Sequence, residues 1–498
     1  MTPSSNFISV SNPSQLEIIK AVAGVAAVQN VEAAIVGGFI RDSLLGRPVR
    51  DLDLAIEGNG RLFAEALAAK LGASMFILHS EAGMYRITLT GQAFDQIDVS
   101  EVDGNLGDDL MRRDFTVDAM GASITLPALN NNQMEIVDPS NGLVDIGQKI
   151  LRAVSPDVFK SDPARLLRGV RLAAELGFTI ESATERLIAE NAALCENVAG
   201  ERTREDLVKL FSLPSAGPAI EYLDRLGLLT RIFPELEPSR GVDQPIEHSW
   251  DVLGHQMKTV EALDWVLRRG YWPYAPTGAQ ELVPWTRAVQ SYFESGVNSG
   301  ASRIALTRLA ALIHDIAKPE TKTQAPNGRV RFYGHPARGA ETAVSMLSRL
   351  RFSQREIKFV AAMVELHMRP TQMGPDSIQP TPKAVYRFHR DAGDAAVATL
   401  YLSLADHLAA RGPTLQLDNF AEHVKIVAYV LSERERQKSK EPQRLIDGNE
   451  LQSRFGLKPG PELGKILDEI VEAQATGEIS TREEGLELAK RLIEAAKS

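Results

Sequence analysis

The 498-residue chain has a single cysteine, Cys195, and only 6% aromatic residues. One cysteine cannot form an intramolecular disulfide, so the sequence predicts a protein of a reducing compartment, and we expect it to be cytoplasmic. Residues 1–6 contain no basic segment followed by an apolar one, and they predict no signal peptide. No apolar run approaches the ~18 residues that cross a bilayer, so we expect no membrane partner.

The chain also has no excess of positive charge, because 55 basic residues face 65 acidic ones and the formal net charge is −10 at pH 7. Proteins that bind nucleic acids are usually basic overall, so any RNA contact should use a local basic stripe on an acidic molecule. The length predicts about three domains, and the 44% hydrophobic content is ordinary for globular proteins. The local basic clusters are Arg165, Arg168 and Arg171, then Arg202, Arg204 and Lys209, then Arg349, Arg351 and Arg355.

The most informative stretch begins with a glycine pair. Residues 33–36 are apolar and predict a buried strand, and residues 39–45 have the spacing of a short helix. Between them, Gly37 and Gly38 let the backbone approach a ligand closely and offer free N–H groups to phosphate oxygens. Arg41 adds a fixed positive charge. A lone glycine pair is usually only a turn, so its interpretation as a nucleotide site depends on the residues that follow.

Those residues supply two carboxylates. The segment 51–56 predicts a second strand, and because side chains alternate along a strand, Asp51 and Asp53 should face the same side, about 7 Å apart. Two carboxylates beside a glycine turn suit divalent metal ions that accompany a nucleotide. Asp98, on a later predicted strand, is either a third carboxylate of this site or a surface charge.

Together, residues 35–57 resemble the nucleotidyltransferase signature of the class II tRNA nucleotidyltransferase and bacterial poly(A) polymerase family. In that family the two strand aspartates hold the catalytic metals. The resemblance implies that Asp51 and Asp53 are catalytic and bind Mg²⁺.

Residues 112–116, Arg-Arg-Asp-Phe-Thr, match a second motif of this family. The resemblance implies that Arg112, Arg113 and Asp114 contact the sugar and triphosphate of the incoming nucleotide, and arginine suits this because its planar fork pairs bidentately with phosphate. From composition alone, these charged residues would be interpreted as the exposed surface of a helix. Asp118 stands where the family usually has Asn, which puts a contact by that amide in doubt.

Residues 161–171 predict a capped helix and resemble the family's base-reading motif. There an Asp and an Arg three residues apart hydrogen-bond the edges of cytosine or adenine, as protein side chains do in nucleic-acid grooves. The resemblance implies this role for Asp162 and Arg165, with Arg168 also binding nucleotide. Without the resemblance, Asp162 and Arg165 would be interpreted as an ion pair on the surface of a capped helix. Ser161 replaces the family's Glu.

Histidines and aspartates recur through the second half of the chain. A single buried histidine is more often a core residue than a ligand, but an adjacent His-Asp with flanking His and Asp resembles the HD-domain family, where four such residues bind one metal. Two more histidines look like those of members competent as phosphohydrolases, although the sequence leaves open whether the site is active. The implied ligands of a divalent metal of unknown identity are His255, His314, Asp315 and Asp406, and the additional histidines are His335 and His367.

The predicted fold class is α+β: a nucleotidyltransferase head with a small mixed sheet, followed by all-α neck, HD and tail domains. The candidate strands are 33–36, 51–56, 85–90 and 94–99, the last two forming a hairpin around Gly91 and Gln92. The predicted domains are 1–150 (head), 151–240 (neck), 241–435 (HD) and 436–498 (tail), with boundaries suggested by proline-rich stretches at 233–245 and 370–383 and the charged run 433–440. The insert 266–300 has no interpretable pattern.

The resemblance implies a tRNA nucleotidyltransferase that adds C-C-A to tRNA 3′ ends from CTP and ATP. Only thirteen residues separate Asp98 from Arg112, whereas members that add the full C-C-A usually carry a longer segment here, so addition of C-C alone is an open alternative. A poly(A) polymerase is a second alternative, but those enzymes carry long basic tails that this chain lacks. The third is an HD phosphohydrolase or phosphodiesterase whose head only senses nucleotides.

Overall fold

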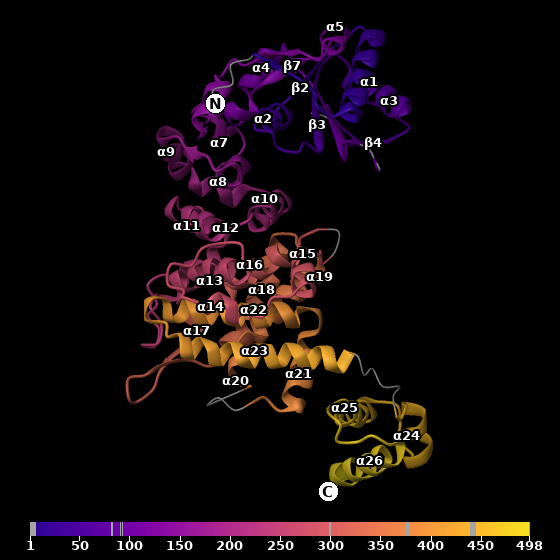
Figure 1. The fold of residues 1–498 in the computed structure, drawn as a ribbon, viewed down its shortest axis with the longest axis vertical. Coiled ribbons are helices and arrows are strands. Elements are labelled where there is room, and N and C mark those ends of the chain that lie inside the picture. The colour runs from indigo at the N-terminus through magenta and orange to yellow at the C-terminus, as the bar shows by residue number, and fades with distance from the viewer. Residues whose placement is uncertain are drawn as a thin grey trace. The chain divides into compact units, whose positions relative to one another are not determined.

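A computed structural model describes residues 6–80, 83–89, 91, 93–297, 300–373, 379–438 and 445–497. The chain forms two compact units, Met1–Val198 with Tyr222–Ile232, and Ala199–Glu221 with Phe233–Ser498 (Figure 1). Several predictions extend outside the described residues: those on residues 1–5, on Thr90 at the end of a candidate strand, on the turn residue Gln92, on residues 298 and 299 of the insert, and on parts of the two linkers after residue 370. The charged run 433–440 begins inside a helix, because α23 (Leu417–Lys438) continues to Lys438.

The first unit is built on one mixed sheet of the order β1-β8-β7-β2-β3-β6-β5-β4. β3 and β6 pair in parallel, and the other neighbours are antiparallel. The expectation of a mixed sheet in an α+β fold is therefore confirmed, and β5 and β6 form the predicted hairpin. The sheet is larger than predicted, since β1, β4, β7 and β8 were missed. The strands are β1 (Phe7–Ile8), β2 (Glu32–Val36), β3 (Asp51–Glu57), β4 (Ser74–His79), β5 (Met84–Thr88), β6 (Gln96–Glu101), β7 (Gly121–Ser123) and β8 (Met134–Val137).

Alternation along the strands gives this sheet two faces. α1 (Pro13–Gln29) and α3 (Gly60–Leu71) pack on one of them, the packed face. The other, called the open face below, carries the carboxylates of the candidate site as well as a small apolar cluster with α4 (Leu106–Met111) that consists of Ala34, Val36, Ala55 and Leu110. On β3, Leu52, Leu54 and Ile56 are fully buried on the packed face, beneath α1 and α3 (Figure 1). The odd-numbered residues of β3 therefore face the other side, and this arrangement positions the candidate site. The remaining helices of this unit include α2 (Gly38–Leu44), η1 (Thr116–Asp118), α5 (Leu126–Asn130), α6 (Gly142–Gln148), α7 (Val158–Ser161), α8 (Ala164–Leu176), α9 (Ser182–Glu190) and α12 (Leu229–Ile232).

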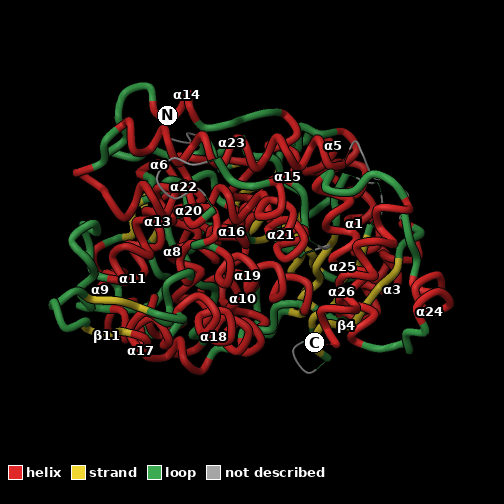
Figure 2. The backbone as a smooth tube through the Cα atoms, turned by 90° about the horizontal axis from the view of Figure 1, so that it is seen from below, coloured by secondary structure: helices red, strands yellow, loops and turns green. Residues whose placement is uncertain are grey.

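The second unit is almost entirely helical, as the periodicity beyond Asp162 predicts, and helices dominate the backbone in Figure 2. Its one described hairpin pairs β11 (Lys322–Gln324) with β12 (Val330–Phe332). None of the described helices in either unit is long and apolar enough to span a bilayer. The helices that matter below are α10 (Gly200–Ser212), α13 (Val252–Val266), α15 (Arg287–Glu294), α16 (Arg303–Ile313), α18 (His335–Arg349), α19 (Gln354–Leu366), α21 (Pro382–Ala392), α22 (Ala396–Arg411), α24 (Gly448–Phe455), α25 (Pro461–Thr476) and α26 (Arg482–Lys497).

The insert 266–300, which the sequence left uninterpreted, contributes to the core of the second unit. Trp272 and Phe293 are almost fully buried, and Trp285 lies parallel to Phe293 at 6.4 Å between ring centroids. At the C-terminal end, α24, α25 and α26 bury their own apolar cluster, which includes Leu451 and Ile470. These three helices therefore form a small bundle with a core of its own.

Candidate active site and a second acidic cluster

Three carboxylates gather on the open face of the sheet. Asp51 and Asp53 lie on the same side of β3, and the parallel register pairs Asp53 directly with Asp98 of β6. Burial, with the added charges of Asp98 and Asp51, raises the pKa of Asp53 to about 6. The charge of Arg113 opposes this shift without reversing it. The surroundings of Asp53 thus disfavour its ionised form, a condition that a bound divalent cation would relieve.

Gly37 brings the backbone against this cluster. Its φ of 70° lies in the left-handed region that favours glycine, and an added Cβ would lie 3.0 Å from Nη1 of Arg113 and 3.7 Å from Oδ2 of Asp53. The expectation of a free N–H at Gly37 is wrong, because this N–H donates to the carbonyl of Met120 at 3.0 Å. Gly37 therefore offers space beside Asp53 and Arg113 rather than a donor. Gly38 follows as the first residue of α2.

Arg41 does not face this space as an unpaired cation. Its guanidinium is buried and donates to both carboxylate oxygens of Asp42 and, at 2.6 Å, to Oδ1 of Asp118. Burial alone would lower the pKa of Arg41, but the carboxylates of Asp118 and Asp42 raise it above its ordinary value. Asp118, the residue that departs from the family pattern, is thus the charge partner of Arg41 and ties η1 to α2.

The predicted arginine pair after α4 is divided between two environments. Arg113 donates to Asp109 at 3.3 Å through Nε and Nη2, and its side chain is 25% exposed. Arg112 donates to the carbonyl of Asp103 at 2.9 Å, and its side chain is 55% exposed. Of the two, Arg113 is the one that lies beside Gly37 and acts on the charge of Asp53.

The residues predicted to read the base lie next to the residues predicted to bind the triphosphate. Arg168 of α8 donates to Oδ2 of Asp114 at 3.2 Å, and Nη2 of Arg165 donates to the carbonyl of Arg112 at 3.1 Å. Asp162 lies just before α8, and its carboxylate accepts from the N–H of Ala164 at 3.2 Å. Nε of Arg165 lies 3.7 Å from Oδ2 of Asp162. Motifs 50 residues apart in the sequence thus form one continuous surface within the first unit.

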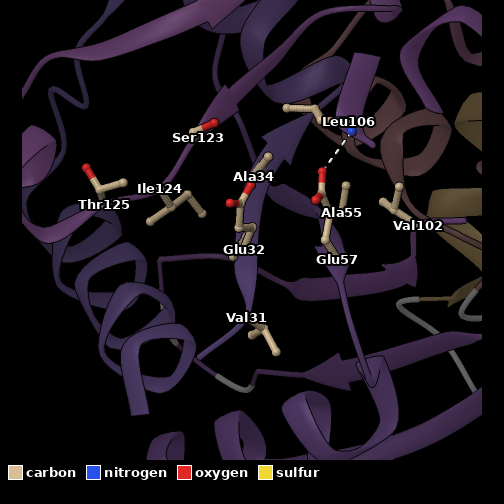
Figure 3. A pocket seen from close by; sticks show the side chains of 11 residues that line it. Val31, Glu32, Ala34, Ala55, Glu57, Val102, Leu106, Ser123, Ile124 and Thr125 are labelled. Atoms are coloured by element: carbon tan, nitrogen blue, oxygen red, sulfur yellow. Dashed lines mark hydrogen bonds between the residues drawn. The ribbon is translucent and has the colours of Figure 1, made fainter. Parts of the chain in front are cut away.

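The connection between β6 and α4 is short and held at both ends. The N–H of Val102 donates to the carbonyl of Ile56 at 2.9 Å, and the N–H of Leu106, the first residue of α4, donates to Oε1 of Glu57 at 2.8 Å (Figure 3). Asn105 caps α4 by accepting from the N–H of Asp108. The two anchors flank a cavity of about 350 Å³ at the ends of β2 and β3. Only residues 102–105 lie between β6 and α4, so the connector is too short to form a long flexible loop.

Side chains from five helices or helix ends converge in the second unit. His255 lies on α13, the adjacent pair follows α16, one histidine begins α18, another follows α19, and the last aspartate lies on α22. All the histidines are buried, and they include the two that the sequence indicated as additional. The converging residues are His255, His314, Asp315, His335, His367 and Asp406.

Asp315 lies at the centre of this cluster, and each of its two carboxylate oxygens lies near two histidine rings. Its Oδ2 lies 3.4 Å from Nε2 of His255 and 3.2 Å from Nε2 of His314. Its Oδ1 lies 3.2 Å from Nε2 of His335 and 3.6 Å from Nε2 of His367. The residues therefore form two sets of metal-binding atoms that share Asp315, whereas the sequence predicted a single set. Asp406 joins the first set, with Oδ1 3.0 Å from Nε2 of His255.

Backbone carbonyls orient three of these rings. Nδ1 of His314 lies 2.9 Å from the carbonyl of Ala311, and His335 and His367 make the same contact with carbonyls at 2.7 and 2.6 Å. A proton on Nδ1 leaves Nε2 with a lone pair toward Asp315, which is the arrangement of histidines that bind metals. The donor set therefore fits a divalent cation.

The cluster opens into a cleft of about 760 Å³. Asp315, Asp406 and His335 reach it from the two metal-binding sets, and cationic side chains line its walls. Lys318 lies 2.6 Å from Oδ2 of Asp315, a contact that the sequence analysis did not anticipate. The cationic lining residues are Lys318, Arg329, Arg331 and Arg411.

Sequence reasoning also missed the partner of Asp98. Arg86 of β5 pairs with this carboxylate through two hydrogen bonds, Nε to Oδ1 and Nη2 to Oδ2, both 2.7 Å long. The hairpin register that places them opposite each other was the available signal, because cross-strand neighbours lie on one face.

Known protein families match this chain both in the predicted head and in the residues that follow it. The family model described as "Poly A polymerase head domain" matches residues 33–152, a model of an "RNA and SrmB-binding site of polymerase A" matches residues 177–239, and a model of "tRNA nucleotidyltransferase domain 2" matches residues 337–489. An A-adding tRNA nucleotidyltransferase of Deinococcus radiodurans is 35% identical over 93% of this chain and 96% of its own length. A CC-adding tRNA nucleotidyltransferase of Thermus thermophilus is 33% identical over 91% of this chain and 92% of its own.

Solved structures share the fold. The Thermotoga maritima CCA-adding enzyme complexed with tRNA aligns with a TM-score of 0.62 at 19% identity, covering 98% of this chain and 99% of its own. A CCA-adding enzyme in complex with CTP aligns with a TM-score of 0.65 at 19% identity, covering 98% and 100%.

Proposed function

The chain belongs to the tRNA nucleotidyltransferase family, and we propose that it adds two cytidines, and no adenosine, to tRNA 3′ ends from CTP. The observation that carries this choice is the connector of residues 102–105, which is fixed to Ile56 and Glu57 at its two ends. Family members that complete C-C-A usually have a longer, flexible segment here. An alternative within the family is addition of the terminal adenosine, the activity named for the Deinococcus relative.

The three carboxylates of the open face fit Mg²⁺, because they lie together on one face of the sheet and because burial and the charges of Asp98 and Asp51 disfavour the charge of Asp53 in the protein alone. Asp51 and Asp53 would hold the ions, which supply charge stabilisation to the attacking and leaving oxygens. Arg113, beside Gly37, would bind the triphosphate with its planar fork. Arg41 would support this region from beneath through Asp118, rather than contact the nucleotide.

Asp162 and Arg165 would select the base. A carboxylate accepts from the exocyclic amine of cytosine, and a guanidinium donates to its ring nitrogen and carbonyl. Arg165 is held by the carbonyl of Arg112, so the base-reading and triphosphate-binding groups are positioned together. Arg168 donates a hydrogen bond to Asp114 at 3.2 Å, and this pair would contact the sugar of the bound nucleotide.

The test is incorporation into tRNA that lacks its 3′ end. Purified protein is incubated with CTP alone, ATP alone, or both, and the products are resolved at single-nucleotide length. We expect two cytidines with CTP and no further extension with ATP. Adenosine after the second cytidine would overturn the C-C proposal, and long adenosine tracts would indicate a poly(A) polymerase. Asp51→Ala should abolish incorporation, and the exposed Asp157→Asn is the matched control.

A second activity is favoured by the cluster around Asp315. We propose that this HD site binds divalent metal ions and hydrolyses phosphate esters, because two metal-binding sets share one carboxylate beside a cleft with cationic walls. Hydrolysis of p-nitrophenyl phosphate and bis(p-nitrophenyl) phosphate is measured with Mg²⁺, Mn²⁺ and Ni²⁺. Asp315→Ala should abolish it, and Asp51→Ala should leave it intact. Failure of every metal to bind the wild-type protein by calorimetry would contradict the site.

The division into head, neck, HD and tail regions stays a proposal, as does a cytoplasmic location. A nucleotide-sensing head without transfer activity is the outcome if wild-type protein binds CTP but extends no tRNA.

A further inference from the structure

A row of side chains runs outward from the catalytic carboxylates across the open face of the sheet. The registers place Asp53 opposite Asp98, Asp98 opposite Arg86, and Arg86 opposite Phe76 on the edge strand β4. Directly opposed residues lie on the same face of a sheet, so all four lie on the face that carries the candidate active site. Arg86 is fixed by its paired hydrogen bonds to Asp98.

The two sides of Asp53 differ in chemistry. On the β2 side, Gly37 and Arg113 lie beside the carboxylate and form the proposed triphosphate pocket. In phosphoryl transfer the attacking and leaving oxygens lie roughly in line across the reacting phosphorus. The pyrophosphate would leave on the side of Gly37 and Arg113, so the 3′-hydroxyl of the primer must come from the opposite side, over β6, β5 and β4. This step rests on the proposed function.

Phe76 is the group on that side suited to RNA. Phe76 is 53% exposed. Because it pairs with Arg86, its aromatic ring lies on the open face of the sheet. Strands lie ~4.8 Å apart, so three strand spacings place Phe76 about 14 Å from the row position of Asp53. A stacked strand rises ~3.4 Å per nucleotide, so about four stacked nucleotides span this distance, or fewer when the strand is extended.

We propose that the open face of β6, β5 and β4 is the track of the single-stranded tRNA 3′ end and that Phe76 stacks on one of its bases. Stacking on an aromatic ring accepts any base, which suits a primer whose terminal sequence changes as it grows. The guanidinium of Arg86, 34% exposed between Phe76 and Asp98, adds positive charge beneath the same strand. Phe76 is a positioning residue for the primer and takes no part in the chemistry.

The test compares Phe76→Ala, Phe76→Trp and Ile77→Ala. Ile77 is the matched control, because it lies on the same strand, is 50% exposed, and pairs with Tyr85 on the packed face. From the range of ~1–3 kcal/mol for base–aromatic stacking, Phe76→Ala should raise KM for tRNA by about 5- to 150-fold and leave KM for CTP within about twofold. Phe76→Trp should retain the wild-type KM for tRNA, and Ile77→Ala should resemble wild type.

Equal KM values for tRNA in Phe76→Ala and wild type would overturn the proposal, as would an equal loss in Phe76→Ala and Ile77→Ala. A loss confined to KM for CTP would place the nucleotide, not the primer, on this side and would also overturn it. If wild-type protein extends no tRNA, the proposed function fails first, and direct binding of tRNA by filter retention still compares the variants. Circular dichroism checks that each variant is folded.

Discussion

Replacing Asp53 by asparagine should stabilise the protein in the absence of metal. The pKa of Asp53 is raised from its ordinary value of 3.8 to about 6, with burial as the largest cause. A raised carboxyl pKa means that the folded state binds this proton more tightly than the unfolded state, so stability falls as pH rises from 4 to 6. At ~1.4 kcal/mol per pKa unit, the ionised group costs up to about 3 kcal/mol at pH 7.5. Asparagine removes the charge and keeps the shape.

The assay is denaturant unfolding of wild type and Asp53→Asn in EDTA, at pH 7.5 and pH 5. The variant should be more stable by up to about 3 kcal/mol at pH 7.5, and the difference should fall to roughly half at pH 5, where the folded wild type is mostly protonated. Asp157→Asn, at an exposed position, is the control and should change little. Equal stability of variant and wild type at pH 7.5 would refute the claim that Asp53 is held at an energetic cost. Nucleotide incorporation should be lost in this variant.

Three further predictions concern buried groups. Asp264→Ala should cost about 3–5 kcal/mol in denaturant unfolding, because it leaves the fully buried Arg308 without the carboxylate that it contacts at 2.6 Å; loss below 1 kcal/mol would contradict this. Asp118→Asn should change stability by less than about 1 kcal/mol, since an amide oxygen still accepts from Arg41, whereas Asp118→Ala should cost more than 1 kcal/mol; equal unfolding midpoints would contradict this. Cys195, whose pKa burial raises to about 12, should react with Ellman's reagent at pH 8 only after unfolding, and rapid reaction of native protein would contradict this.

Much of the head could be predicted because its signals are local. Alternation along one strand placed Asp51 and Asp53 on one face, and a strand–glycine–helix pattern located Gly37 beside them. The pairing of Asp53 with Asp98 depends on a parallel register between strands 45 residues apart, and no local pattern specifies that register. The interpretation of Arg41 was incomplete for the same reason, because its partner Asp118 lies 77 residues away.

The missed strands have a different cause. β1 and β7 are too short for periodicity to appear, and β4 is an edge strand whose apolar residues remain exposed. The sequence Ser-Met-Phe-Ile-Leu-His is apolar without alternating, so the pattern of a half-buried strand is absent. In the second unit, the adjacent His314 and Asp315 were the basis for predicting a metal site, and the structure brings the predicted ligands together. The sharing of Asp315 between two sets of ligands needs four separate helices to meet, and only the structure shows it.

The two acidic centres of the chain are balanced in opposite ways, and pH should separate them. Imidazoles and Lys318 hold the pKa of Asp315 well below its ordinary value despite burial, so its carboxylate stays ionised as pH falls. Asp53 has no comparable compensation, and protons compete for it below pH 6. If Mg²⁺ binds Asp53, the Mg²⁺ concentration for half-maximal CTP incorporation should rise by up to about tenfold per pH unit below 6, because a cation must displace one proton. Titration of Mg²⁺ at pH 7.5, 6 and 5 measures this, and a half-saturating concentration that is unchanged at pH 5 would show that Asp53 does not take part in binding the ion.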